Sequence, residues 1–94
     1  MQNKEFHVGK LIQERLNYEE HSVSWLARKL DCDRSNIYRI FDREHMDTNL
    51  LLKISIILDY NFFELYSKRL DKLQSAYQKN GKDLSKVMEK KKND

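Results

Sequence analysis

The sequence predicts an all-α fold of five short helices, and three features of the chain indicate it. Proline is absent and glycine occurs only twice, although the tight turns of sheet proteins depend on these two residues. Apolar residues recur at the three- and four-residue spacing of a helix, and short polar segments separate the apolar stretches. The 94 residues suffice for one domain, expected over residues 1–66, and a helical extension over residues 67–94.

The apolar spacing places each helix along the chain. The first is expected over residues 5–18, where four apolar residues share one face: Val8, Leu11, Ile12 and Leu16. The other expected helices cover residues 24–30, 34–41, 48–58 and 62–79. Polar side chains that can accept from free backbone amides precede them: Ser22 or Ser24, Asp33, Asp47 or Thr48, and Asn61. The turn of residues 31–33 separates the second and third helices.

The fourth predicted helix is apolar nearly all round. Leu51, Ile54, Ile57 and Leu58 repeat at helical spacing, and Leu50, Leu52 and Ile56 widen this stripe. A helix with apolar residues on every side is typical of a protein interior. We therefore expect the fourth helix to be central and buried on several sides.

The net charge of +3 is unevenly distributed. Residues 1–66 hold nine Lys and Arg against eleven Asp and Glu, whereas residues 67–94 hold nine against four. A nucleic-acid-binding surface in the first part must therefore be a locally basic face, because the average charge there provides no attraction.

Composition makes several classes of protein and site poor fits. The longest apolar runs are three residues, far shorter than a membrane span, and the N-terminal residues lack the apolar region of an export signal. The single cysteine, Cys32, allows no internal disulfide, and we expect a cytoplasmic protein. His21 and Cys32 are too few ligands for zinc, so we expect no metal and no cofactor. The chain has no glycine-rich phosphate loop and no Ser/His/Asp order, so we do not expect an enzyme.

Residues 21–43 carry the pattern of a helix-turn-helix motif. Such a motif needs a small residue where its first helix crosses the second, and Ala27 stands at this point. It also needs apolar residues beside the crossing, a small apolar residue in the turn, and apolar anchors on the second helix. The residues that meet these demands are Leu26, Ala27, Leu30, Cys32, Ile37 and Ile40. They predict two short helices at a steep angle, with the second protruding so that it can enter the DNA major groove.

Over residues 8–65 the chain resembles the Cro/C1-type (Xre) helix-turn-helix family of bacterial and phage regulators, in particular its short Bacteroides-like members. The similarity includes residues 8–12, 26–30, 34–40, 51–58 and 61–65. It implies a five-helix, lambda-repressor-like domain that binds operator DNA, commonly as a homodimer. The family usually has glycine where this chain has Asp31, but aspartate tolerates the left-handed backbone conformation required there. Val23 replaces a glutamine, and Phe41 and Arg43 replace a glutamate and a glycine.

The third helix would present most of its polar side chains on the face away from Ile37 and Ile40. The candidate base contacts are Arg34, Ser35, Asn36, Tyr38 and Arg39. An arginine can donate to both O6 and N7 of guanine, which specifies the base. For Arg34 and Arg39 the alternatives are phosphate contact or a solvated surface. The candidate phosphate contacts, which position the protein without specifying sequence, are Arg28, Lys29, Arg43 and Lys53.

The sequence allows two roles for the C-terminal extension. Tyr66, Leu70, Leu73 and Tyr77 are spaced by four, three and four residues, as in a seam that pairs with its copy in a second protomer. The same residues would also suit a helix that packs on its own domain. Asn80 and Gly81 should stop the helix, and we expect residues 83–94 to be mobile.

These patterns favour a transcriptional regulator that binds palindromic double-stranded DNA as a homodimer and represses by occupying promoter DNA. One alternative is the antitoxin of a toxin–antitoxin pair, in which the same fold also binds a toxin. Another is a helical adaptor that contacts proteins alone through Trp25, Tyr38 and the extension. We expect no membrane partner.

Overall fold

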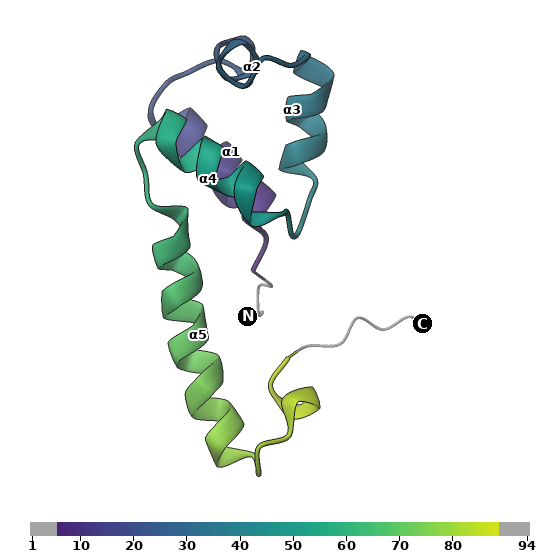
Figure 1. Ribbon diagram of the computed structural model, residues 1–94, viewed down its shortest axis with the longest axis vertical. Helices are drawn as coiled ribbons and strands as arrows, with labels where there is room; N and C mark the ends of the chain where they lie inside the picture. Colours follow the sequence, from purple (N-terminus) through teal and green to yellow (C-terminus); the bar gives the residue numbers. More distant parts are fainter. Residues whose placement is uncertain (1–5, 89–94) are drawn as a thin grey trace. The chain divides into compact units, whose positions relative to one another are not determined.

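The computed structural model describes residues 6–88, which form five α-helices, one short 3₁₀ helix and no strand (Figure 1). The predicted all-α fold is therefore confirmed. The helices are α1 (Val8–Tyr18), α2 (Val23–Leu30), α3 (Arg34–Phe41), α4 (Thr48–Leu58), α5 (Phe62–Lys79) and η1 (Leu84–Lys86). Two compact units meet in the chain between Tyr60 and Asn61, so that α1–α4 belong to one unit and α5 and η1 to the other.

Side chains cap four of the five described α-helices at their N-termini. Oxygens of Ser22, Asp47 and Asn61 accept from the backbone amides of the residues three positions later, at 3.0, 2.8 and 3.2 Å. His7 caps α1 in the same way through Nδ1, 3.2 Å from the amide nitrogen of Lys10. Because the backbone of His7 is extended, α1 begins at Val8, so the start expected near Glu5, a residue outside the described part of the chain, is too early. The cap at Ser22 likewise begins α2 at Val23, one residue before the predicted start.

Two aspartates end helices in the left-handed conformation usually taken by glycine. Asp31 after α2 has φ 59° and Asp59 after α4 has φ 51°. The chain then reverses, and the amide of Cys32 donates to the carbonyl of Ala27 at 2.9 Å, closing the last turn of α2. The expectation that Asp31 adopts this conformation is confirmed.

The first unit has one apolar core, to which all four helices contribute. The buried side chains are Val8, Ile12 and Leu16 of α1, Leu26 and Ala27 of α2, Ile37, Ile40 and Phe41 of α3, and Leu51, Ile54 and Leu58 of α4. Helix α3 contacts both α1 and α2, and α2 also contacts α4. Figure 1 shows α2 end-on and α3 from the side, so the axes of the two helices run in clearly different directions.

Helix α4 is buried on one face only, so the prediction of a helix enclosed on several sides is wrong. Ile54 is fully buried, whereas Leu52 is 48 % exposed and Ile56 is 71 % exposed. Leu50 and Ile57 are half-buried. The pattern of apolar residues shows where a helix could pack, but it does not fix how many neighbours the fold supplies.

The second unit consists of α5 and the segment after it. Helix α5 ends at Lys79, directly before Asn80 and Gly81, which were predicted to end it. Gly81 has φ 71°. The amide of Lys82 donates to the carbonyl of Tyr77 at 2.8 Å. The predicted mobile segment, residues 83–94, includes the 3₁₀ helix η1, capped by the Asp83 side chain. Residues 89–94 lie outside the described part of the chain.

None of the described helices is long and apolar enough to cross a membrane.

Candidate nucleic-acid interface

Helices α2 and α3 contact each other as a helix-turn-helix motif requires. Of the six predicted motif residues, Leu26, Ala27, Ile37 and Ile40 are buried. Leu30 and Cys32 are half-buried, and both line a surface pocket. The small side chain of Ala27 is 3 % exposed on α2, which contacts α3.

The C-terminal end of α3 is fixed by a close backbone contact with the start of α1. The amide of Gly9 donates to the carbonyl of Arg43 at 2.9 Å, and the amide of Val8 donates to that of Glu44 at 3.2 Å. A Cβ atom on Gly9 would lie 2.7 Å from the Arg43 carbonyl oxygen and closer still to those of Ile40 and Phe41. Only glycine fits here without displacing backbone.

Sequence reasoning assigned no role to Gly9. The only indication in the sequence was that a glycine stands at the second position of a helix, where helix formation does not require one. Such a residue often indicates close packing, but the sequence does not show which backbone approaches it.

The outer face of α3 carries four exposed polar side chains, those of Arg34, Ser35, Tyr38 and Arg39. The ring of Tyr38 packs edge-on against Phe41 with 6.0 Å between ring centroids, and the residue remains 50 % exposed. The contact with Phe41 therefore restrains the Tyr38 ring while half of the residue stays exposed to solvent.

Asn36 lies apart from that outer face. It is half-buried, and its Oδ1 accepts a hydrogen bond from Arg39 Nη1 at 3.2 Å. This bond restrains the Arg39 guanidinium, whose other N–H groups can still face a ligand.

The first turn of α3 retains backbone amides that no side chain caps. Asp33 is in the N-cap position, as predicted, but its side chain makes no capping hydrogen bond. By contrast, Ser22 caps α2 at the amide of Trp25. Free amides at a helix N-terminus are suited to binding an anion, although the Asp33 carboxylate at this end opposes that.

The motif is locally basic. Residues 21–43 include five Lys and Arg and three Asp, a surplus that contrasts with the acidic average of residues 1–66. The four candidate phosphate contacts, Arg28, Lys29, Arg43 and Lys53, are all exposed. Positive charge near α3 therefore comes from α2, from α4 and from the segment after α3.

Aromatic and charged side chains cluster where α1 leads into α2. The rings of His21 and Trp25 are stacked with centroids 3.6 Å apart, and Lys29 Nζ lies 5.7 Å from the centroid of Trp25. Arg15 donates to Glu19 at 2.6 Å and its guanidinium lies 4.3 Å from the ring centroid of Tyr60. Arg15 is thus held by interactions within the unit.

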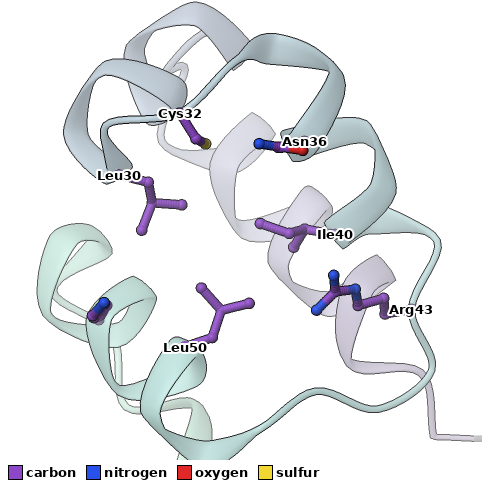
Figure 2. A pocket seen from close by; sticks show the side chains of 7 residues that line it. Leu30, Cys32, Asn36, Ile40, Arg43 and Leu50 are labelled. Carbon is purple, nitrogen blue, oxygen red and sulfur yellow. The ribbon is translucent and has the colours of Figure 1, made fainter.

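A pocket of about 300 Å³ opens between the end of α2, α3 and the start of α4 (Figure 2). Leu30, Cys32, Ile40 and Leu50 form its apolar wall, and Asn36, Arg43 and Lys53 complete the lining. In Figure 2 the Leu30 and Leu50 side chains approach from opposite sides, and the guanidinium of Arg43 turns toward the space between α3 and α4. The pocket brings together three candidate DNA contacts from separate parts of the sequence.

The candidate dimer residues on α5 differ in exposure. Leu70 is 59 % exposed, whereas Tyr66, Leu73 and Tyr77 are half-buried. Burial raises the pKa of the Tyr66 hydroxyl above its ordinary value, and the charge of Arg69 opposes part of that rise.

Within residues 6–88, no three His, Cys, Asp or Glu side chains are grouped so that they could hold a metal ion.

Comparison with known proteins adds no relative. No protein-family model matches the sequence, and no curated protein or solved structure matches the chain. The functional reading therefore depends on the geometry and charge of the helices described above.

Proposed function

We propose that the protein is a sequence-specific, DNA-binding transcriptional regulator that inserts α3 into the major groove. In this proposal it acts in the cytoplasm and represses by occupying a palindromic promoter site as a homodimer. The observation that carries the proposal is the two-sided character of α3. Ile37, Ile40 and Phe41 are buried, whereas Arg34, Ser35, Tyr38 and Arg39 are exposed on the outer face.

The contacts that hold α3 in place support a role in recognising DNA bases better than a purely structural role. An eight-residue helix is unstable alone, so its direction depends on its neighbours. Both α2 and α1 contact α3, and the Gly9 junction follows its last turn. A helix held in this way can present arginines to base edges with little loss of conformational entropy on binding.

The remaining cations suit the DNA backbone. Arg28 and Lys29 lie in the last turn of α2, and Arg43 and Lys53 lie beside the pocket. Phosphate contacts from such residues would orient α3 on the duplex, while arginines of α3 would specify bases.

A homodimer explains the helical seam of α5. Tyr66, Leu70, Leu73 and Tyr77 recur at the spacing of a coiled-coil stripe, and Leu70 leaves most of its side chain exposed. A two-fold dimer presents two copies of α3 and therefore favours a palindromic site.

The proposal is tested by selecting bound fragments from random duplex DNA with the purified full chain. Arg34→Ala and Arg39→Ala should weaken binding to the selected site, and loss of a guanine contact should reduce discrimination at one base pair by about 1–3 kcal/mol. Lys72→Ala removes an exposed cation of α5 and serves as the charge-matched control. Unchanged affinity in both arginine variants, with helicity intact, contradicts the assignment of α3 as the reading helix.

The dimer is tested separately by the mass of the protein in solution. Replacing Leu70 and Leu73 with alanine should convert a wild-type dimer into a helical monomer and remove cooperative binding to a palindrome. A wild type that is monomeric at micromolar concentration, or a double variant that remains dimeric, excludes this interface.

A further inference from the structure

The pocket beside α3 has features of a small-molecule site. Its volume of about 300 Å³ lies at the lower end of the range found for ligand sites, which are typically apolar with a few polar groups. Leu30, Ile40 and Leu50 supply the apolar wall, with the Cys32 side chain beside them. All of these residues belong to one compact unit, so a single folded body forms the pocket.

The charge at the pocket has one sign. Arg43 and Lys53 both line it, and among residues 6–88 no acidic side chain does. Two cations beside an apolar wall are complementary to a molecule with an anionic group and an apolar body. We propose that this pocket binds a small organic anion with an apolar body, of the class of the aromatic carboxylates.

The chemistry of the lining argues against a small anion without an apolar body as the ligand. Phosphate or acetate would engage the cations but leave the surface of Leu30 and Leu50 in water. An aromatic acid removes this apolar surface from water, which stabilises the complex by roughly 25 cal/mol for each Å² buried. Its carboxylate meanwhile meets the positive charge that Arg43 and Lys53 place along the lining.

Such a ligand would oppose DNA binding, and this consequence rests on the proposed function. Asn36, Arg43 and Lys53 line the pocket and are also candidate DNA contacts. A carboxylate bound to Arg43 and Lys53 neutralises charge that would otherwise meet phosphate. The DNA-binding unit would therefore contain its own effector site, without a separate sensory domain.

The pocket can be probed directly because Cys32 is the only cysteine of the chain. Labelling of the full-length protein by N-ethylmaleimide, a neutral reagent, therefore reports on Cys32 alone, at the wall of this pocket. Naphthoate should slow labelling, by roughly tenfold at ten times its dissociation constant. Naphthamide, which lacks the charge, and acetate, which lacks the rings, should protect much less at the same concentration.

Two variants test the role of the cations. Arg43→Gln and Lys53→Gln should each weaken protection by naphthoate, whereas Lys72→Gln, a change of the same charge on α5, should leave it unaltered. Both lining cations are exposed, and circular dichroism checks that the variants remain helical. Absence of protection at millimolar naphthoate overturns the site, and equal protection by naphthamide overturns the requirement for an anion.

The competition with DNA is a separate arm. Naphthoate should raise the dissociation constant for the selected duplex in wild type and less so in Arg43→Gln. Protection of Cys32 without any effect on DNA affinity overturns the competition but keeps the pocket. If no duplex is bound under any condition, the proposed function fails, and labelling of Cys32 still decides whether the pocket binds its anion.

Discussion

Replacing Gly9 with alanine should destabilise the first unit although alanine is the better helix former. The added Cβ would lie 2.7 Å from the Arg43 carbonyl oxygen and closer to those of Ile40 and Phe41. All three are backbone atoms, so no flexible side chain can move aside. Helix α1 must therefore shift away from the end of α3.

The size of the effect follows from three contributions. Overpacking typically costs about 1–3 kcal/mol, and the two hydrogen bonds from Val8 and Gly9 to residues 44 and 43 contribute about 0.5–1.5 kcal/mol each. Alanine in place of a helical glycine returns up to about 1 kcal/mol. Together these contributions lower the expected free energy of unfolding of Gly9→Ala by about 1–6 kcal/mol, a range centred on about 3.5 kcal/mol.

Urea denaturation followed by circular dichroism measures this loss. Gly81→Ala is the matched control, because nothing lies within 4 Å of its added Cβ and its only penalty is the left-handed backbone at φ 71°. That penalty is about 1–2 kcal/mol at most and arises beyond the end of α5. An unfolding midpoint of Gly9→Ala equal to that of wild type would refute the close contact between α1 and the end of α3.

Three further changes test other parts of the structure. Ala27→Leu should destabilise by about 1–3 kcal/mol through overpacking where α2 meets α3, and a thermal melt without any loss of stability would contradict that packing. Asp31→Gly should stabilise by about 0.5–1 kcal/mol, since glycine adopts the left-handed conformation of Asp31 without strain; a lower melting temperature would be the contrary result. Tyr66 keeps its proton to higher pH when folded than when unfolded, so its contribution to stability should fall as the pH rises above 10.0. Tyr66→Phe should reduce that decline in alkaline denaturation, and an identical pH dependence in both proteins would contradict the burial of Tyr66.

Local chemistry explains why the helices could be predicted from sequence. A Ser, Asp or Asn that caps a helix acts on an amide three residues away, so both partners stand in one short stretch of sequence. His7 caps α1 over the same distance but is not among the preferred capping residues, and the expected start of α1 was therefore too early. The expectation of a left-handed conformation at Asp31 came from the family that the sequence resembles, which usually has glycine at this position.

The parts that sequence did not reveal depend on contacts between distant segments. Gly9 is defined by carbonyl groups more than thirty residues away. The pocket likewise requires the end of α2, α3 and the start of α4 to meet, so Lys53 and Cys32 gave no sign of being neighbours. Leu52 and Ile56 led to the wrong prediction that α4 is buried on several sides, because an apolar residue at helical spacing need not pack against a neighbouring helix.

A different backbone feature lies at each end of α3, and we expect the two together to fix the direction of the helix and of its arginines. Before α3, the left-handed Asp31 reverses the chain so that α2 and α3 can cross; after it, the Gly9 junction holds the carbonyls of residues 43 and 44. On the proposed function, a variant at Gly9 that still folds should therefore lose DNA affinity through misdirection of Arg34 and Arg39, even at temperatures where nearly all molecules are native. Affinity that falls only in proportion to the unfolded fraction would show instead that the orientation of α3 does not depend on this junction.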